Sequence, residues 1–336
     1  MLKVAQIGVG YWGPNLLRNL VSNTQVIVEK VCELDESRRE YVVSMYPAIT
    51  VVDNAKSIIE DPSIDAVIIA TPVHTHFELA KQCLENGKHI LVEKPMAHTL
   101  EEVTELGVIA EKNKCVAMSG HTFLFNDAVR YVKDYIKSGE LGEVRYIYSQ
   151  RLNLGRIRHD VDALWNLAPH DISIIQYWLD DLEPSSYLSA GMDYIQKNIE
   201  DVVFVNLTYP NKVLANIHVS WLDPHKTRKM TIVGSKKMIV YDDMAEYKIA
   251  IYDKNIVPKA VVGENMDYDN VNMVPQFQNH QGSLSYPKIS YKEPLKQEIN
   301  HFIDCIQNNT PCISGIEHTK KVVKILSESS KQYAPA

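Results

Sequence analysis

The feature that most constrains the fold of this chain is a regular alternation of apolar runs and helical segments over its first 120 residues. The apolar runs lie at 4–7, 26–31, 49–52, 66–70, 89–92 and 116–118. Helical spacing and turn residues fill the intervals, as at 35–46, 74–86 and 100–113. Continuous apolar strands separated by helices of roughly 10–15 residues are typical of a parallel sheet buried on both faces. Right-handed crossovers then predict a doubly wound α/β sheet.

The pattern changes after about residue 120, where a helix is expected at 127–137. Period-two segments follow at 144–152, 202–208, 213–221, 230–233, 238–241 and 247–252. They predict a large, mainly antiparallel open sheet, with one helix at 172–179 between its first two strands. Residues 253–292 show no clear period and are expected to form a long loop with short strands. Two closing helices are expected at 298–307 and 319–329.

A length of 336 residues fits two domains best. We place an α/β dinucleotide-binding domain at 1–120 and an α+β domain for substrate binding and oligomerisation at 121–336. The terminal helices of the second domain can pack back on the first.

Composition narrows the class of protein. Hydrophobic residues make up 45% of the chain and charged residues 23%, which is typical of globular proteins and excludes a disordered or fibrous chain. The net charge of −7 argues against nucleic acid or an anionic membrane as the main partner. The beginning of the chain lacks the long apolar region of a signal peptide, and no apolar run approaches the ~18 residues of a transmembrane helix.

The cysteines and histidines predict neither a disulfide framework nor a metal site. Five cysteines are scattered without a CxxC pair, so we expect reduced thiols in a cytoplasmic protein. His74 and His76 form an HxH pair, but no third ligand is evident.

A glycine-rich loop follows the first strand, where Gly8, Gly10 and Gly13 match GxGxxG. The first glycine permits a tight turn, the second lets the backbone approach a pyrophosphate, and the third allows close helix–strand packing. Glu33 lies 20 residues beyond Gly13, at the end of the second strand. Its carboxylate would accept hydrogen bonds from a ribose and repel a 2′-phosphate, which favours NAD over NADP. The alternative is a tight turn that binds nothing.

Two further segments, at 70–74 and 91–95, lie at strand carboxyl ends, where open α/β sheets bind their ligands. Lys94 directly follows a buried strand and is flanked by Glu93. Partial burial lowers the pKa of a lysine, and an adjacent carboxylate opposes that shift. Such a lysine can hydrogen-bond a substrate oxygen and share its proton.

Four motifs in order resemble the Gfo/Idh/MocA oxidoreductases, the family of glucose-fructose oxidoreductase and inositol dehydrogenase. They are the glycine loop, Thr71-Pro72-Val73-His74, Glu93-Lys94-Pro95 and the segment that ends in Asn166-Leu167-Ala168-Pro169-His170. The resemblance extends over nearly the whole chain. It implies that Lys94 is the catalytic lysine, with a cis peptide bond to Pro95, and that His170 is the acid/base residue. Many members carry an aspartate where this chain has Asn166; an amide cannot take a proton, so proton transfer falls on His170 and Lys94.

The motifs, the arginines after residue 144 and this resemblance together predict the residues around the ligands. Expected to bind the cofactor are Gly8, Gly10, Tyr11, Trp12, Gly13, Glu33, Thr71, Pro72, His74, Glu93, Lys94 and His121. Expected to bind the substrate are Lys94, Arg151, Asn153, Arg156, Trp165, Asn166 and His170. Packing is the commoner role for tryptophans such as Trp12 and Trp165.

Oxidation of a secondary alcohol moves a hydride to the nicotinamide while a base takes the hydroxyl proton. A histidine suits that base, and a lysine stabilises the developing alkoxide. Because His170 is expected at the start of the 172–179 helix, the positive end of the helix dipole should keep its imidazole neutral.

The substrate is suggested by Arg145, Arg151, Arg156 and Arg158, a cluster that would suit a diphosphate or carboxylate. A solvated sheet face explains the cluster equally well. Segments 11–15 and 150–155 are most similar to family members that oxidise the C3 hydroxyl of UDP-N-acetylglucosamine or its uronic acid. Three alternatives remain: a dehydrogenase of a free polyol or hexose, a glycosidase or epimerase that cycles bound NAD internally, and a non-catalytic sugar- or NAD-sensing protein.

Family members usually pair through the second sheet, so we expect a homodimer or homotetramer. Val213, Ala215, Ile217 and Val219 supply enough apolar surface for a core and an interface, but periodicity alone does not assign them.

Overall fold

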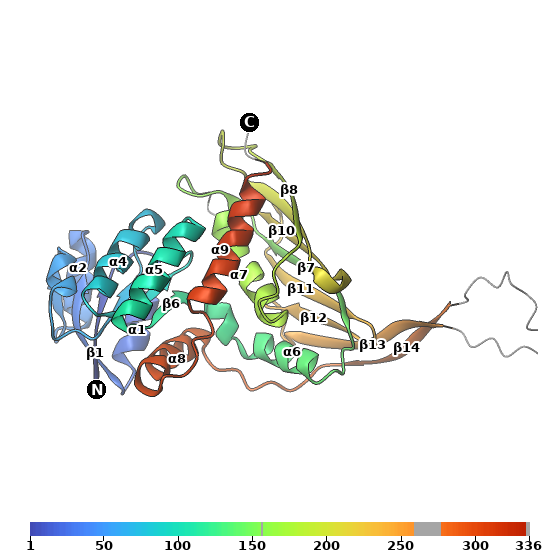
Figure 1. Cartoon of the computed structure of the whole chain (residues 1–336), viewed down its shortest axis with the longest axis horizontal. Coiled ribbons are helices and arrows are strands. Elements are labelled where there is room, and N and C mark those ends of the chain that lie inside the picture. The colour runs from blue at the N-terminus through green and yellow to red at the C-terminus, as the bar shows by residue number, and fades with distance from the viewer. Residues whose placement is uncertain (156, 259–276, 334–336) are drawn as a thin grey trace, which may run out of the picture.

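The computed structural model describes residues 1–155, 157–258 and 277–333. This part of the chain forms a six-stranded and an eight-stranded sheet, with helices around and between them (Figure 1). Arg156, one of the expected substrate contacts, lies outside the described residues.

The first sheet is parallel, with strand order β3-β2-β1-β4-β5-β6. Its strands are β1 (Leu2–Ile7), β2 (Val26–Cys32), β3 (Thr50–Val52), β4 (Ala66–Ile69), β5 (His89–Glu93) and β6 (Ala117–Gly120). The direction of winding reverses between β1 and β4, so the predicted doubly wound sheet is confirmed. A reversal of this kind leaves a crevice outside the carboxyl ends of the strands, where ligands bind.

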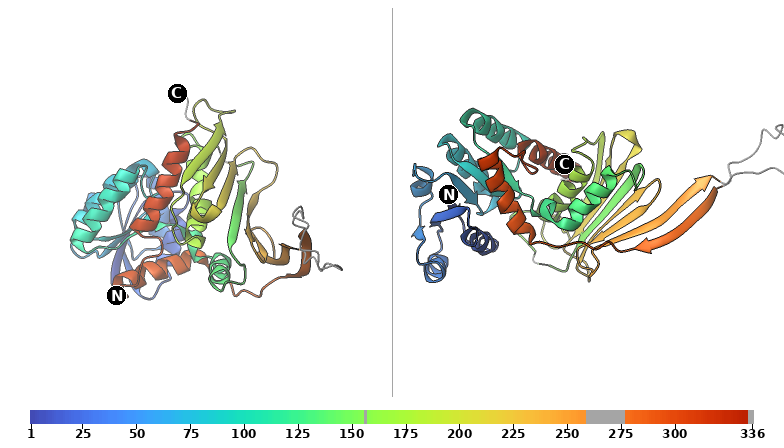
Figure 2. Two further views of the ribbon diagram at one scale, coloured as in Figure 1. Left: turned by 45° about the vertical axis from the view of Figure 1, so that its right-hand side comes forward. Right: turned by 90° about the horizontal axis from the view of Figure 1, so that it is seen from below.

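Helices cover both faces of this sheet, and all four residues of β4 are buried (Figure 2). The helices are α1 (Gly13–Val21), α2 (Glu36–Met45), α3 (Lys56–Ile59), α4 (His76–Glu85) and α5 (Leu100–Asn113), with the 3₁₀ turn η1 (Val73–Thr75) before α4. Burial on both faces explains why the strands read as unbroken apolar runs in the sequence.

The second sheet has the order β14-β13-β12-β11-β7-β10-β9-β8. Its strands are β7 (Val144–Leu152), β8 (Ser186–Met192), β9 (Val202–Thr208), β10 (Leu214–Ser220), β11 (Thr227–Gly234), β12 (Met238–Asp242), β13 (Ile249–Pro258) and β14 (Phe277–Ser285). β7 and β10 run parallel, and the other neighbours in the order are antiparallel. The predicted mainly antiparallel sheet is therefore confirmed.

Helices cover one face of the second sheet, between it and the first sheet, and the opposite face carries none in the described chain (Figure 2). The covering helices are α6 (Asp127–Lys137), α7 (Ala163–Trp178) and α9 (Ile316–Ser330). Along β10, Ala215, Ile217 and Val219 are buried on the covered face, whereas Leu214 is exposed. The apolar residues that periodicity left unassigned therefore belong to the core. α8 (Pro294–Asn308) packs beside α1, and α9 contacts both α5 and α7.

Three expectations about the second half of the chain are wrong. The helix expected at 172–179 begins at Ala163, because Asp162 caps it by accepting from the backbone N–H of Trp165 and Pro169 lies inside it. β8 was not foreseen. β13 and β14 are strands of ten and nine residues rather than a loop with short strands, although residues 259–276 of that segment lie outside the described part.

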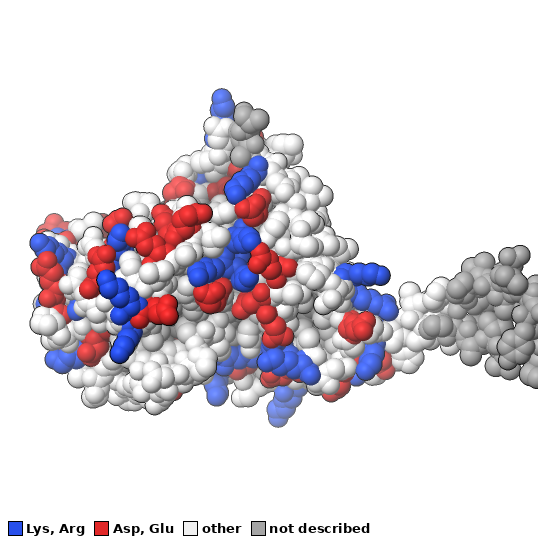
Figure 3. Space-filling model, in the orientation of Figure 1, with Lys and Arg blue, Asp and Glu red and all other residues white. Residues whose placement is uncertain are grey.

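The surface mixes both charges. On the face shown in Figure 3, Lys and Arg residues are interspersed with Asp and Glu residues. Among the described helices, none combines the length and the apolar character needed to cross a bilayer.

Candidate functional site

A cleft of about 830 Å³ lies at the carboxyl edge of the first sheet, where it meets the second sheet. The loops after β1, β4 and β5 line one side of it. The end of β7, the middle of α7 and the beginning of β11 line the other side. It lies at the switch point of the first sheet, the place where a doubly wound fold binds its ligand.

The glycine loop has the geometry of a phosphate cradle. Gly8 has φ +94°, and a Cβ there would lie 2.6 Å from the Ala70 carbonyl oxygen; a Cβ on Gly13 would lie 2.7 Å from the Gly8 carbonyl oxygen. Gly10, by contrast, faces open space, so a ligand can approach its backbone closely. No side chain caps the N-terminus of α1 among the described residues. Pro14 has no N–H and the N–H of Asn15 donates to the Trp12 carbonyl oxygen at 3.0 Å, so the N–H of Gly13 is the helical donor that can bind an anion.

Glu33 ends β2 beside this loop. Its Oε2 accepts from the backbone N–H of Val9 at 2.6 Å, and its Oε1 accepts from the N–H of Leu34 at 2.8 Å. These bonds fix the carboxylate beside the glycine loop, although Glu33 itself is not among the residues that line the cleft. Tyr11 and Trp12 line the cleft, with Tyr11 87% exposed.

Glu93 is the last residue of β5 and Lys94 follows it directly, and the Lys94–Pro95 peptide bond is cis. The Lys94 ammonium donates to the Asn166 carbonyl oxygen at 3.0 Å, which connects the first sheet to α7. Burial lowers the pKa of Lys94, against the opposing charge of Glu93. Burial likewise raises the pKa of Glu93, and Gly120 packs closely against it: a Cβ at residue 120 would lie 3.2 Å from the carboxylate, a tight contact.

His170 lines the cleft from the middle of α7, one helical turn after Asn166. The expectation that a helix start keeps it neutral is therefore wrong, since the ring lies far from the helix end. Burial lowers the pKa of His170 well below its usual value, and the charges of Lys94 and Arg151 lower it further. The neutral imidazole was thus correctly expected, for the wrong reason. Its Nδ1 is buried with no hydrogen-bond partner among the described residues, so Nε2 is the ring nitrogen available to a ligand in the cleft.

Arg151 reaches the cleft but is already bound. Its Nε and Nη2 donate to Oδ1 of Asp171 at 3.1 and 2.7 Å, and both side chains are buried. The guanidinium also stacks 4.7 Å from the ring of Phe123, which contacts the His170 ring edge-on at 4.9 Å. Arg151 therefore helps to position His170 through the Phe123 ring. It is not the free anion ligand that the sequence suggested.

The structure brings most of the other expected residues to the cleft. Thr71, Pro72, Asn153 and Asn166 line it. Besides Glu33, three expected side chains lie elsewhere. His74 is exposed on η1, His121 is buried edge-on against His318 at 5.5 Å, and Trp165 donates its indole N–H to Ser330 on α9. For each of them, a residue directly beside it in the sequence lines the cleft instead, because consecutive side chains point in different directions.

Several cleft residues were missed. His76 is buried and forms hydrogen bonds at 2.8 Å with the carbonyl oxygens of Pro95 and Thr71, so it joins the loops after β4 and β5. Lys226 and Arg228 line the far end, where Arg228 pairs with Asp243 and lies opposite Arg151 in the β7–β11 ladder. The HxH pair was a signal for His76. That Lys226 and Arg228 lie in the same cleft as Arg151 can be recognised only once the strand register is known.

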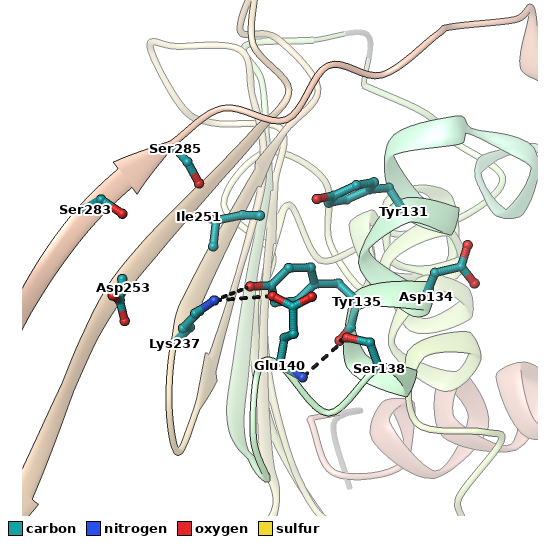
Figure 4. A pocket seen from close by; sticks show the side chains of 10 residues that line it. All are labelled: Tyr131, Asp134, Tyr135, Ser138, Glu140, Lys237, Ile251, Asp253, Ser283 and Ser285. Atoms are coloured by element: carbon teal, nitrogen blue, oxygen red, sulfur yellow. Dashed lines mark hydrogen bonds and ion pairs between the residues drawn. The ribbon is translucent and has the colours of Figure 1, made fainter.

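A second cavity of about 460 Å³ lies between α6 and the strands β13 and β14 (Figure 4). Its one lysine, Lys237, donates to the Tyr135 hydroxyl at 2.9 Å and pairs with Glu140 at 3.3 Å. The basic group of this cavity is thus already neutralised, and no histidine or cysteine lines it. The reactive side chains are gathered in the larger cleft.

A glycine cradle, an acid at the end of β2, and a lysine and a neutral histidine across one cleft define an oxidoreductase with a dinucleotide cofactor. The chain belongs to the Gfo/Idh/MocA family. Residues 2–121 match the model of the oxidoreductase family with an NAD-binding Rossmann fold, and residues 129–240 match the GFO/IDH/MocA C-terminal domain, together more than half of the chain. The cofactor is NAD, which the cradle and Glu33 fit.

Similar proteins include dehydrogenases. The chain is 32% identical to the uncharacterized oxidoreductase YdgJ of Escherichia coli over 181 residues, about half of either protein. It is 24% identical to scyllo-inositol 2-dehydrogenase (NAD(+)) of Bacillus subtilis over 95% of this chain and 90% of that one. The structure of UDP-N-acetylglucosamine 3-dehydrogenase GnnA from Acidithiobacillus ferrooxidans superposes with a TM-score of 0.82 at 19% identity, covering 99% and 98% of the two chains.

Proposed function

We propose that this protein oxidises a secondary hydroxyl, at C3, of a UDP-N-acetylated sugar, with NAD as the oxidant. One observation carries the proposal: Lys94, after β5 of the first sheet, and His170, on α7, line one cleft, and the Lys94 ammonium is hydrogen-bonded to Asn166 one turn before His170. A lysine and a neutral histidine in that position are the groups that alcohol oxidation requires.

Each group has a distinct role in the proposed reaction. His170 accepts the hydroxyl proton at Nε2, because its buried environment holds the ring neutral. Lys94 donates a hydrogen bond to the same oxygen and stabilises the negative charge that develops there. Asn166 holds the lysine through its carbonyl oxygen and offers its amide to a neighbouring hydroxyl. When bound, NAD supplies the hydride acceptor.

The basic far end of the cleft supports a substrate with a diphosphate. Lys226 is exposed there, and no ion pair engages it among the described residues. Arg158 and Arg228 lie beside it, each paired with one carboxylate, Asp160 and Asp243. All three cations line the side of the cleft that the second sheet and its loops form, and in this proposal they bind the nucleotide group attached to the sugar. The name of the structural neighbour GnnA points to the same class of substrate.

A dehydrogenase of a free polyol is the second candidate. The similarity to scyllo-inositol 2-dehydrogenase over nearly the whole chain favours it. Such an enzyme needs Lys94 and His170 but makes no use of Lys226.

Substrate screening separates these candidates. Purified protein is mixed with NAD and a panel of UDP-N-acetylhexosamines, their uronic acids, free hexoses and inositols, and NADH absorbance is followed. We expect NADH to form with the UDP-sugars only, and Lys226→Ala to raise their KM. NADH formed with free polyols alone would overturn the nucleotide-sugar assignment. No reaction, with NAD retained through purification, would favour an enzyme that cycles its cofactor internally.

We also propose that the chain forms a homodimer or homotetramer through the open face of the second sheet. Tyr146, Phe204 and Leu214 are more than 40% exposed there, and their strands are neighbours. Phe204 stacks on His218 of the adjacent strand at 4.1 Å, which gives this face a flat aromatic patch. Exposed apolar patches of this kind mark association surfaces.

A further inference from the structure

His301, Cys305 and Cys312 form a cluster at the far end of α8, and none of the three lines the NAD cleft. Their potential ligand atoms all lie within 4.8 Å of one another. Nε2 of His301 lies 3.4 Å from Sγ of Cys305, and Sγ of Cys312 completes the group within the same 4.8 Å. Three donors of the type that soft metals prefer are therefore already gathered.

The local fold explains this convergence. His301 and Cys305 are four residues apart on α8, so they share one face of the helix. The helix ends at Asn308, and the next residue, Asn309, turns the chain back with a φ of +54°. The returning loop is then fixed from both sides: Thr310 is hydrogen-bonded to Asp304, and the Ser314 carbonyl oxygen accepts from the N–H of Ser119 on β6 at 2.9 Å. These bonds place Cys312 beside the helix.

We propose that His301, Cys305 and Cys312 bind one Zn²⁺ ion. With Zn–S distances of about 2.3 Å and Zn–N distances of about 2.0–2.1 Å, tetrahedral ligand atoms lie roughly 3.4–3.8 Å apart. The distance of 3.4 Å between His301 and Cys305 already has that value. The site supplies three protein ligands, so a water molecule completes the tetrahedron.

One contact must change when the metal binds. The backbone N–H of Ile313 donates to Nε2 of His301 at 3.1 Å and so occupies the lone pair that zinc requires. Ile313 directly follows Cys312, so the movement that brings the sulfur to the metal also moves this N–H. Cys305 is buried, whereas His301 and Cys312 are partly exposed, which gives the ion a path from solvent.

The proposed ion would fasten the loop 309–315 to α8. That loop pairs with β6 through the Met118–Gly315 bridge, and α8 holds η2 (Thr122–Phe125) because Glu298 accepts from the Thr122 hydroxyl at 2.9 Å. The role is therefore structural, and it does not depend on the substrate that the cleft accepts. The sequence did not suggest this site because Cys312 lies on a loop with no regular spacing from the other two ligands.

Cobalt(II) tests the site directly, because it substitutes for zinc and is coloured in a tetrahedral thiolate environment. The reduced full-length protein is freed of metal with a chelator and titrated with Co²⁺ under exclusion of air. We expect one equivalent to give thiolate-to-cobalt charge-transfer and tetrahedral d–d bands, and Zn²⁺ to abolish them. Zn²⁺ should also raise the unfolding temperature of the metal-free protein.

Matched cysteine variants distinguish this site from the other thiols. Cys305→Ala and Cys312→Ala should weaken cobalt binding by more than the ~10–100-fold that follows loss of an outer-shell partner. Cys115→Ala, which removes a partly exposed cysteine elsewhere, should bind cobalt like the parent. Circular dichroism of the metal-free variants confirms that they are folded. The proposal is wrong if the parent shows no tetrahedral bands, if the Cys305→Ala/Cys312→Ala double variant keeps them, or if the two cysteines are found joined as a disulfide that binds no metal.

Discussion

Lys94 and His170 are the residues on which turnover should depend most. Replacing either by alanine removes a proton-transfer or charge-stabilising group, so we expect kcat/KM to fall by about 10²–10⁴-fold. NAD binding, measured by titration calorimetry, should survive, because the glycine cradle lies on another loop. Lys137→Ala, on the exposed end of α6, is the control and should leave kcat unchanged. Full turnover in both cleft variants would contradict the assigned roles.

Asn166 should determine where the pH profile of the enzyme falls. The pKa of His170 is held well below its usual value, so the neutral base persists below pH 6.5, and the lowered pKa of Lys94 places the alkaline limb below the usual 10.5. In Asn166→Asp, a carboxylate would favour the charged form of both groups and raise both pKa values. We therefore expect both limbs of kcat/KM against pH to move upward. Asn166→Ala, which adds no charge, should not move them in this way; limbs of Asn166→Asp that coincide with those of the parent would refute the electrostatic argument.

Glu33 should determine the choice of cofactor. Removing its carboxylate deletes a charged hydrogen-bond acceptor, each worth about 1.5–3 kcal/mol, so Glu33→Ala should weaken NAD binding roughly 10–100-fold. NADP should lose less, because the repulsion of its 2′-phosphate disappears at the same time. Glu40→Ala on the exposed side of α2 is the matched control. An unchanged ratio of the two dissociation constants would show that Glu33 does not face the ribose.

At the scale of elements, the sequence predicted the helices and strands whose burial leaves a recognisable hydrophobic pattern. It missed elements that leave no such pattern. β4 is buried throughout and was found as an apolar run. β14 is exposed at every residue, so no alternation of apolar and polar residues reveals it. The first half of α7 is hard to predict because it contains Pro169, and a proline inside a helix normally breaks it. In the structure this proline lies within α7, the helix that carries both Asn166 and His170. The helix whose start was predicted wrongly is therefore the one most important for the site.

The ion pair between Arg151 on β7 and Asp171 on α7 should hold these two elements together. Because both charges are buried, removal of one leaves the other unpaired, and we expect Arg151→Ala or Asp171→Ala to cost about 3–5 kcal/mol of unfolding free energy. The double variant should cost clearly less than the sum, since it leaves no orphaned charge. Urea unfolding of the four proteins measures this. The exposed pair of Lys81 and Glu105 is the control, with an expected value of about 0–1 kcal/mol.

At the scale of the whole molecule, the sequence indicated both sheets and the order of motifs along the chain, because local periodicity and turn chemistry carry that information. The contacts between strands and side chains that lie far apart in the sequence could not be foreseen. Arg151 lies beside Arg228 only through the β7–β11 register, and each arginine finds its carboxylate on a different element. The open face of the second sheet belongs to the same class of feature, since strand order decides which apolar residues gather on it.

That open face should be where copies of the chain associate. A stable interface buries about 800 Å² per partner, and a charge placed at its centre would be desolvated without a partner. We expect the parent to have the mass of a dimer or tetramer by light scattering, and Phe204→Asp to dissociate it by at least one step. Val108→Asp is the matched control, because Val108 is equally apolar and 62% exposed but lies on α5, away from this sheet. A monomeric parent, or a Phe204→Asp variant of unchanged mass, would show that the aromatic patch on this sheet is not the contact between subunits.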